Sequence, residues 1–150
     1  MTDFHVCQLT AEDLPLMYAL LSMFGAAFED PGTYGANRPD EAYFQNLLGR
    51  DYFIALAAVR DGEVIGGLAA YELQKFEQAR SEIYIYDLAV DDAHRRKGVA
   101  TALIQELQTI ARTRGAYVIF VQADYGDDPA IALYTKLGTR EDVMHFDIPV

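Results

Sequence analysis

Apolar residues recur at intervals of three and four along several stretches of the chain, which is the spacing of one face of a helix. This spacing predicts helices over 14–28, from about 40 to 48, over 99–114 and over 129–137. Thr10-Ala11-Glu12-Asp13 is typical of a helix start, and a glycine follows each of the last three helices. The residues expected to face the core are Leu14, Met17, Leu21, Phe24, Phe28, Tyr43, Phe44, Leu47, Leu48, Val99, Leu103, Leu107 and Ile110.

Runs rich in β-branched and aromatic residues predict strands, after a first strand that contains Cys7. Asp61-Gly62 predicts a tight hairpin turn, Gly66-Gly67 a bulge, and the segment from Asp30 to Gly35 a loop. The order of elements predicts an α/β fold with a mixed central β-sheet flanked by helices, in which one strand, helix and strand form a βαβ unit. The predicted strands cover 52–59, 63–73, 82–90, 117–123 and 143–148, and the βαβ unit comprises 82–90, 99–114 and 117–123.

The composition fits a folded domain that carries its own core. The chain has 150 residues, of which 51% are hydrophobic, so we expect one domain over residues 1–150. There is no run of 18 or more apolar residues, and the N-terminus lacks the basic and apolar regions of a signal peptide. Cys7 is the only cysteine, which excludes an internal disulfide. These features predict a cytoplasmic protein that does not enter a membrane.

The charge is strongly negative overall and positive at one place. A formal net charge of −11 argues against a nucleic-acid partner and favours a cationic one. Three consecutive cations, Arg95, Arg96 and Lys97, stand between a predicted strand and a predicted helix and are followed by Gly98. Helix N-termini attract anions through their free N–H groups, so this loop predicts a phosphate site. The alternative is a solvated basic turn, and neither a P-loop nor a dinucleotide fingerprint is present.

The loop Arg95-Arg96-Lys97-Gly98-Val99-Ala100 resembles the Arg/Gln-x-x-Gly-x-Gly/Ala pyrophosphate loop of the general N-acetyltransferase (GNAT) superfamily. The order of elements agrees along the whole chain. Over its last two-thirds the chain is similar to the GNAT-type aminoglycoside 3-N-acetyltransferases, and its first 45 residues resemble them more weakly. The segments that carry this narrower resemblance are 53–58, 68–71, 76–78, 80–90, 115–119, 121–130, 132–138 and 143–148.

The resemblance implies acetyl-CoA as cosubstrate and assigns residues to it. The end of the 82–90 strand, namely Leu88, Ala89 and Val90, is expected to offer backbone groups to the pantetheine arm. The pyrophosphate is expected on Arg95, Arg96, Lys97, Gly98, Val99, Ala100 and Thr101. The matching tyrosine, Tyr134, is expected to protonate the departing thiolate, although a core aromatic is the alternative. Asp127 stands where many members carry Asn, which predicts a carboxylate near the cofactor arm or the acceptor.

Asp87 is the strongest candidate for catalysis on chemical grounds. It lies within an apolar predicted strand, where an unpaired carboxylate is costly and Asp is rare. An amine acceptor arrives protonated, and a carboxylate can attract the ammonium and accept its proton. The alternative is a structural Asp that caps a bulge or pairs with an arginine.

Further acidic residues predict how a polycationic acceptor is held, because each ammonium group needs an oxygen partner. Glu29, Asp30 and Asp142 are additional members of this expected group. The three histidines, His5, His94 and His145, have no metal-ligand spacing, so no metal is expected. The residues predicted to bind the acceptor are Tyr86, Asp87, Asp124, Asp127, Asp128 and Glu141.

The resulting hypothesis is direct acetyl transfer, in a ternary complex, to the 3-amino group of a 2-deoxystreptamine aminoglycoside, which would give antibiotic resistance. Three alternatives stay open: acetylation of another amine such as a polyamine or a peptide, an acyl-CoA-binding module without turnover, and a nucleotide-binding protein. The resemblance also allows a homodimer, since GNAT domains often pair.

Overall fold

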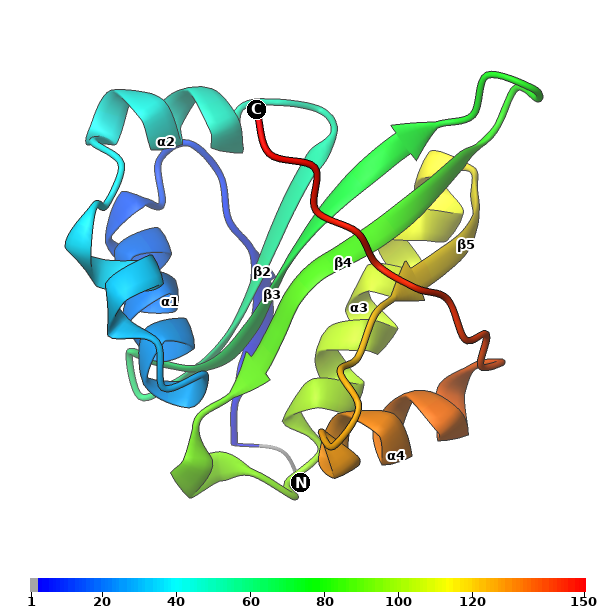
Figure 1. Ribbon diagram of the computed structural model, residues 1–150. Coiled ribbons are helices and arrows are strands. Elements are labelled where there is room, and N and C mark those ends of the chain that lie inside the picture. The colour runs from blue at the N-terminus through cyan, green and yellow to red at the C-terminus, as the bar shows by residue number, and fades with distance from the viewer. Residues whose placement is uncertain (1–2) are drawn as a thin grey trace.

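The computed structural model describes residues 3–150 and contains a five-stranded sheet with helices on both faces (Figure 1). No helix in these described residues is long and apolar enough to cross a membrane. The elements are β1 (His5–Gln8), α1 (Leu14–Ala27), a π-helical turn η1 (Gly32–Ala36), α2 (Glu41–Leu48), β2 (Phe53–Arg60), β3 (Glu63–Gln74), β4 (Ser81–Val90), a 3-10 turn η2 (Asp92–His94), α3 (Val99–Arg114), β5 (Ala116–Val121) and α4 (Asp128–Leu137).

The sheet has the strand order β1-β2-β3-β4-β5. The first four strands pair antiparallel, and β4 pairs with β5 in parallel. Helix α3 makes the crossover that a parallel pair requires. The predicted mixed sheet and the βαβ unit over 82–90, 99–114 and 117–123 are therefore confirmed.

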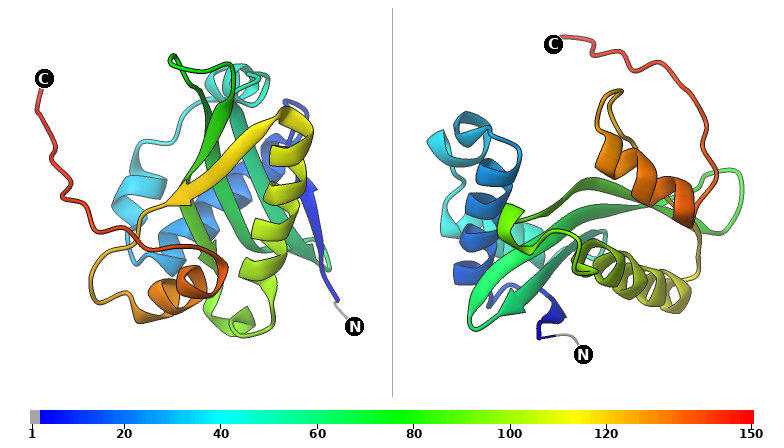
Figure 2. Two further views of the ribbon diagram at one scale, coloured as in Figure 1. Left: turned by 90° about the vertical axis from the view of Figure 1, so that its right-hand side faces the viewer. Right: turned by 90° about the horizontal axis from the view of Figure 1, so that it is seen from below.

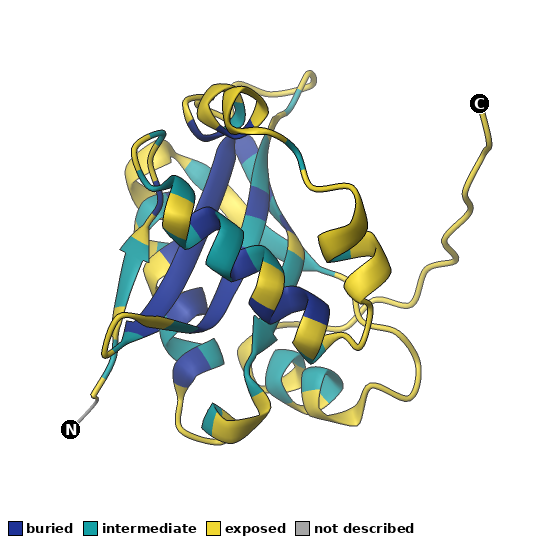
Figure 3. Ribbon diagram, turned by 90° about the vertical axis from the view of Figure 1, so that its left-hand side faces the viewer, coloured by how far each residue is buried: buried dark blue, intermediate teal, exposed yellow. Residues whose placement is uncertain are grey.

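Two apolar clusters lie on opposite faces of the sheet. Residues of α1 and α2 pack on one face, against alternate positions of β2 such as Phe53, Ala55 and Ala57. Residues of α3 pack on the other face, against Ile54 and Leu56 of the same strand. Both faces of β2 are covered, so the strand is buried along almost all of its length (Figure 3). Its continuous apolar sequence is the pattern of a central strand.

The inward face of α1 differs from the predicted stripe. Leu20 and Met23 are buried together with Met17 and Phe24, whereas Phe28, predicted to face the core, is 39% exposed. The cause is close contact with β3, where Leu20 Cδ1 occupies the space that a Cβ at Gly67 would need. In α2, Phe44 and Leu48 are buried but Tyr43 is 59% exposed, so its predicted core position is wrong.

The hairpin between β2 and β3 forms as Asp61-Gly62 predicts. Asp61 has φ +50° and Gly62 has φ +80°, the signs that a type I′ turn requires at both central residues. The predicted bulge lies one residue earlier, because Ala58 pairs with Gly66 and Val59 with Val64, which leaves Ile65 as the extra residue. Gly66 and Gly67 instead allow close packing of side chains from the two helix layers.

The predicted strand over 143–148 is wrong for the described structure. Residues 139–150 have no helix or strand, every one of them is exposed, and the segment leaves the body of the molecule (Figure 2). A strand needs the backbone of a neighbour to complete its hydrogen bonds, and this segment lies beside none. We call residues 139–150 the C-terminal segment.

Candidate active site

A bulge in β4 determines to which side of the sheet Tyr86 and the candidate catalytic residue Asp87 point. Ala69 of β3 pairs with Asp87 and Ala70 pairs with Ile85, so Tyr86 is the extra residue between them. Ile85 and Leu88 both belong to the cluster beneath α3. Because side chains alternate along a strand, one residue would normally separate them, and here there are two. Tyr86 and Asp87 therefore both lie outside the apolar cluster beneath α3.

The two parallel strands separate beyond this bulge. Their pairing runs from Ser81 to Ile85 of β4 and ends at Val121 of β5. In the described residues, 86–90 of β4 pair with β3 alone. The backbone groups of this stretch that face β5 therefore have no ladder partner, and they include those predicted to meet a pantetheine arm at Leu88, Ala89 and Val90.

Asp87 is half-buried and has one side-chain partner, Tyr34, whose hydroxyl donates to Asp87 Oδ2 at 2.9 Å. Burial raises the pKa of Asp87 above the ordinary range of a carboxyl, and the hydrogen bond from Tyr34 partly opposes this effect. Burial and the Asp87 charge in turn raise the pKa of Tyr34, so its phenol stays protonated and keeps donating. Of the two structural alternatives, the arginine partner does not occur in the described residues, where the partner is Tyr34. The other alternative, a place at a bulge, agrees with the position of Asp87 directly after Tyr86.

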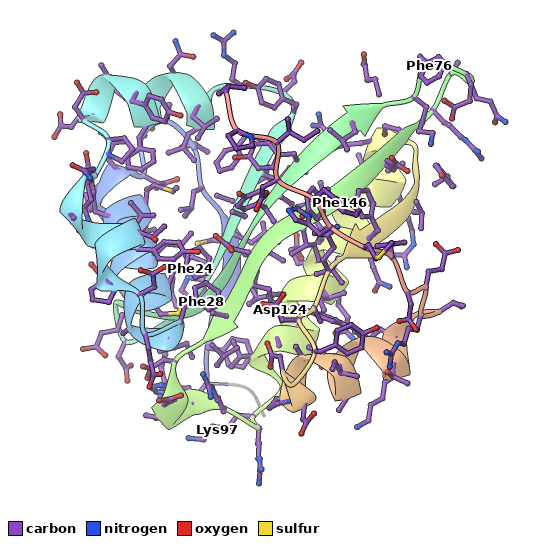
Figure 4. The ribbon with its side chains drawn as sticks, viewed as in Figure 1. Phe24, Phe28, Phe76, Lys97, Asp124 and Phe146 are labelled. Atoms are coloured by element: carbon purple, nitrogen blue, oxygen red, sulfur yellow. The ribbon has the colours of Figure 1, made fainter. Side chains whose placement is uncertain are left out.

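Tyr34 was not singled out by the sequence, where its segment reads as a loop. The segment forms the turn η1, and the Tyr34 ring lies 5.9 Å from Phe24 and 5.6 Å from Phe28 between centroids. Phe24 lies in α1 and Phe28 directly follows it, and both lie on the side of α1 that faces the sheet (Figure 4). Arg38 Nε donates to the Tyr34 carbonyl at 3.1 Å and Arg38 Nη2 to Ser22 Oγ at 2.6 Å. These contacts hold the hydroxyl over Asp87.

A row of four tyrosines begins at Tyr86, which directly precedes Asp87. The four, which we call the tyrosine surface, are Tyr52, Tyr71, Tyr84 and Tyr86. Ring centroids of Tyr71 and Tyr86 lie 6.0 Å apart, and those of Tyr84 and Tyr86 lie 5.9 Å apart. The four side chains line an open cavity of about 870 Å³, together with Glu72 and others. Aromatic faces attract cations through their negative π-electron density, so this cavity suits a positively charged ligand.

The loop before α3 has the form of an anion site. Gly98 has φ +81° and Arg96 has φ +62°, and a Cβ added at Gly98 would meet no atom within 4 Å. The N–H groups of Val99, Ala100 and Thr101 precede the first helical hydrogen bond, which Ala102 makes to Gly98 O at 3.0 Å. This loop fits a pyrophosphate, because it has open space, free N–H donors and the charges of Arg96 and Lys97. Lys97 extends into solvent (Figure 4).

Arg95 has a different place from its two neighbours. Its Nη2 pairs with Asp92 Oδ1 at 2.9 Å, and its Nε donates to Val90 O at 3.3 Å. Arg95 therefore braces the loop against the end of β4, and much of its charge is compensated within the protein.

Tyr134 of α4 packs against the cluster beneath α3. Burial, followed by the nearby charge of Asp127, raises the pKa of Tyr134 to about 12. Asp127 is the N-cap of α4 and its Oδ1 accepts from Ala130 N at 3.4 Å. The carboxylate predicted to face a ligand thus has a structural function, which is common for Asp at this position.

The acidic residues do not form one cluster. Asp124 lies in the loop between β5 and α4 (Figure 4), close in sequence to Asp127 and Asp128. Glu141 and Asp142 lie beyond the other end of α4, which is about 15 Å long. Asp142 Oδ1 pairs with Arg140 Nε at 2.8 Å, and Asp30 Oδ1 accepts from Thr33 N at 3.1 Å. Residues 3–150 contain no group of three or more His, Cys, Asp or Glu suited to a metal ion.

The profile of the acetyltransferase (GNAT) family matches residues 17–139, which include the bulged strand, the anion loop and α4. The chain belongs to the GNAT acetyltransferase family. It is thus an acetyltransferase, of a family that uses acetyl-CoA, and it has the expected GNAT fold.

Two solved GNAT structures cover nearly the whole chain. The aminoglycoside acetyltransferase HMB0005, from an uncultured soil metagenomic sample, is 62% identical with a TM-score of 0.97, covering 100% of this chain and 99% of its own. The aminoglycoside acetyltransferase meta-AAC0020, also from an uncultured soil sample and in complex with sisomicin, is 31% identical with a TM-score of 0.92, covering 99% of this chain and 97% of its own.

A curated GNAT relative acts on a different amine. The L-methionine sulfoximine/L-methionine sulfone acetyltransferase of Pseudomonas aeruginosa is 31% identical over 103 residues, which are 69% of this chain. The match spans 58% of that relative's length. Acceptors therefore differ among GNAT proteins of this degree of similarity.

Proposed function

We propose that this protein transfers the acetyl group of acetyl-CoA to the 3-amino group of a 2-deoxystreptamine aminoglycoside, and so gives antibiotic resistance. The main support is the full-length similarity, at 62% identity, to the aminoglycoside acetyltransferase HMB0005. The choice of the 3-amino group rests on the sequence resemblance to the 3-N-acetylating enzymes. Under this proposal residues 1–150 act as one catalytic domain.

The acceptor side of the proposal is supported by charge and by aromatic rings. Asp87, half-buried at the bulge, gives an ammonium group a carboxylate partner in a partly desolvated position. The tyrosine surface continues from Asp87 along β4 and β3 and offers ring faces to further ammonium groups. A net charge of −11 attracts a polycation over longer distances.

When bound, acetyl-CoA supplies a thioester whose carbonyl carbon the amine attacks. Unpaired backbone groups of β4 beyond Ile85 are suited to hold the pantetheine arm, and Arg96, Lys97 and the N–H groups of Val99 to Thr101 are suited to the pyrophosphate. Asp87 attracts the ammonium group and accepts its proton, and its raised pKa makes it a stronger base than an ordinary carboxylate.

Tyr134 acts on the leaving sulfur as a proton donor. Burial and the charge of Asp127 raise its pKa to about 12, so the phenol holds its proton at neutral pH until the thiolate forms. As the C–S bond breaks, the phenol donates its proton to the sulfur, and solvent then returns a proton to the phenolate.

A thiol-release assay with acetyl-CoA tests the proposal. We expect turnover with gentamicin-class aminoglycosides, and NMR of the product should locate the new amide at the 3-amino group. Polyamines, peptide N-termini and methionine sulfone serve as competing acceptors. Turnover restricted to these amines would refute the aminoglycoside assignment. If calorimetry shows that acetyl-CoA binds but no amine causes thiol release, the protein is an acyl-CoA-binding module without turnover.

Replacing Tyr34 by Phe should move the acidic limb of the kcat/KM profile to higher pH. The hydrogen bond from Tyr34 lowers the pKa of Asp87, so its loss allows burial to raise that pKa further. Tyr18→Phe is a matched control, because Tyr18 donates to Pro39 O at 2.9 Å and not to Asp87. If the acidic limb does not shift in Tyr34→Phe, or shifts equally in both variants, then the Tyr34 hydrogen bond does not lower the pKa of Asp87.

Replacing Tyr134 by Phe should lower kcat by about tenfold, the lower end for a lost hydrogen bond to a charged group. Because the pKa of Tyr134 is about 12, the wild-type profile should show no basic limb from this residue near neutral pH. Tyr125→Phe is the control, since Tyr125 is 80% exposed in the loop before α4. If kcat is unchanged in Tyr134→Phe, the hydroxyl has no part in catalysis and the ring serves only in packing.

A further inference from the structure

The tyrosine surface leaves aromatic rings exposed beside the half-buried Asp87. Tyr52 is 47% exposed and Tyr86 is 63% exposed. The rings of Tyr52 and Tyr71 are nearly parallel, with 19° between their planes, whereas the ring of Tyr86 stands at 79° to that of Tyr71. The rings therefore present faces in two directions along the cavity of about 870 Å³. Exposed aromatic rings that line a cavity indicate a ligand with apolar faces of its own.

The phenol groups of this surface are also free to bind a ligand. The Tyr84 hydroxyl donates to Gln122 Oε1 at 2.9 Å. The other three hydroxyls of the surface have no partner among residues 3–150: Tyr52, Tyr71 and Tyr86. A phenol both donates and accepts a hydrogen bond, whereas an ammonium group only donates. A sugar hydroxyl can therefore pair with both functions of the phenol, and an ammonium group with one.

An aromatic stretch separates the two ends of the surface. Asp87 pairs with Ala69 of β3, and Glu72 follows Ala69 by three residues, which is about 10 Å along the strand. The side chains that line the cavity between these two carboxylates are Tyr71, Tyr84 and Tyr86. A six-membered ring with its substituents fits this length, and the stretch itself is uncharged.

The charges at the far end are mostly compensated within the protein. Glu72 Oε1 accepts from Arg114 Nε at 2.6 Å, and Glu72 Oε2 accepts from Ser81 Oγ at 2.6 Å. Arg114 also donates to the carbonyl of Asp51, an exposed residue of the cavity lining. An ammonium group thus has a partly desolvated partner at Asp87 and only a solvated one at the far end. The aromatic stretch between them is better suited to the neutral part of a ligand.

We infer that the tyrosine surface holds a sugar ring, and that it binds neutral saccharides as well as aminoglycosides. A saccharide ring with equatorial substituents has C–H groups on both faces. Their partial positive charge is attracted by the negative face of an aromatic ring. The inference deepens the proposed function, on which its link to the acceptor rests. A neutral saccharide lacks the amine that attacks the thioester, so it occupies the acceptor site without turnover and inhibits competitively.

Saturation-transfer NMR and kinetics with methyl β-cellobioside test this inference on the intact chain. All ring substituents of this neutral disaccharide are equatorial. Sorbitol has similar hydroxyl groups but no ring, and is the control ligand. We expect saturation transfer to the ring protons of the disaccharide and none to sorbitol. In the thiol-release assay the disaccharide should raise the KM for the aminoglycoside and leave kcat unchanged.

Variants of Tyr86 separate the ring from its hydroxyl. Tyr86→Leu removes the ring and should weaken binding of the disaccharide by about tenfold, while Tyr86→Phe keeps the ring and should weaken it less. Because Tyr86 is 63% exposed, neither change removes core packing. Tyr125→Leu is the control, since Tyr125 is 80% exposed and lies outside the cavity lining.

The outcomes distinguish this inference from the proposed function. Absence of saturation transfer to the disaccharide, or equal transfer to sorbitol, overturns the inference even if aminoglycosides are acetylated. Affinities for the disaccharide that are equal in Tyr86→Leu and Tyr125→Leu also overturn it. If the disaccharide binds in a manner that depends on Tyr86 but no aminoglycoside is turned over, the saccharide site is supported and the proposed function fails.

Discussion

Replacing Asp87 by Asn is expected to reduce kcat/KM by about 100- to 10,000-fold, the usual contribution of a positioned proton acceptor. Asn is similar in size, and its Oδ1 can still accept the hydrogen bond from Tyr34, so the fold around the bulge should persist. Glu106→Gln is the control, since Glu106 is exposed on α3. The measurement is steady-state thiol release with varied aminoglycoside and varied acetyl-CoA.

The pH dependence and the stability of Asp87→Asn provide separate readouts. Wild-type kcat/KM should fall as the pH decreases through the raised pKa of Asp87, and the variant should lack this limb. Because the folded-state pKa is raised, the ionised carboxylate destabilises the fold above that pKa, and the effect disappears below the ordinary pKa. The variant should therefore have a higher Tm at neutral pH. Activity equal to that of wild type, with the limb retained, would exclude Asp87 as the acceptor of the proton.

Replacing Gly98 by Ala is expected to raise the KM for acetyl-CoA by about 100-fold, while kcat at saturation changes much less. The new Cβ would occupy the open space over the loop and keep the pyrophosphate from the N–H groups of α3. Two charge-assisted hydrogen bonds of about 1.5 kcal/mol each account for this factor.

Gly62→Ala separates this effect from backbone strain. Gly62 has φ +80° and Gly98 has φ +81°, and a Cβ at either would meet no atom within 4 Å. Both variants should lose similar stability in thermal unfolding, but only Gly98→Ala should lose affinity for acetyl-CoA in calorimetry. Equal affinities in the two variants would show that the loop before α3 does not hold the pyrophosphate.

The parts of the fold that the sequence predicted are those with strong local signals. The helix over 99–114 has the predicted bounds, because its apolar spacing is regular and Gly115, with φ +78°, ends it. The hairpin at Asp61-Gly62 follows from two residues that tolerate positive φ. The anion loop was also predictable, since its cations, its glycine and the helix start are consecutive in the chain.

The parts that were not predictable depend on contacts between distant residues. Tyr34 and Asp87 are 53 positions apart, and the turn that brings them together has no apolar periodicity. The bulge at Tyr86 depends on the register with β3, which one strand alone does not specify. The same holds for the C-terminal segment, whose alternation is that of a strand although the described chain offers it no neighbour.

The extra residue in β4 adds a side chain beside the carboxylate without changing the side on which the carboxylate lies. If Tyr86 were deleted, the regular alternation would return, and Asp87 alone would stand between Ile85 and Leu88, still on the face away from α3. The bulge therefore gives β4 two neighbouring side chains on one face, a half-buried carboxylate at position 87 and an aromatic ring at position 86 that is 63% exposed. Under the proposed function, evolution can alter the exposed ring, and with it the choice of amine, while the carboxylate keeps its place.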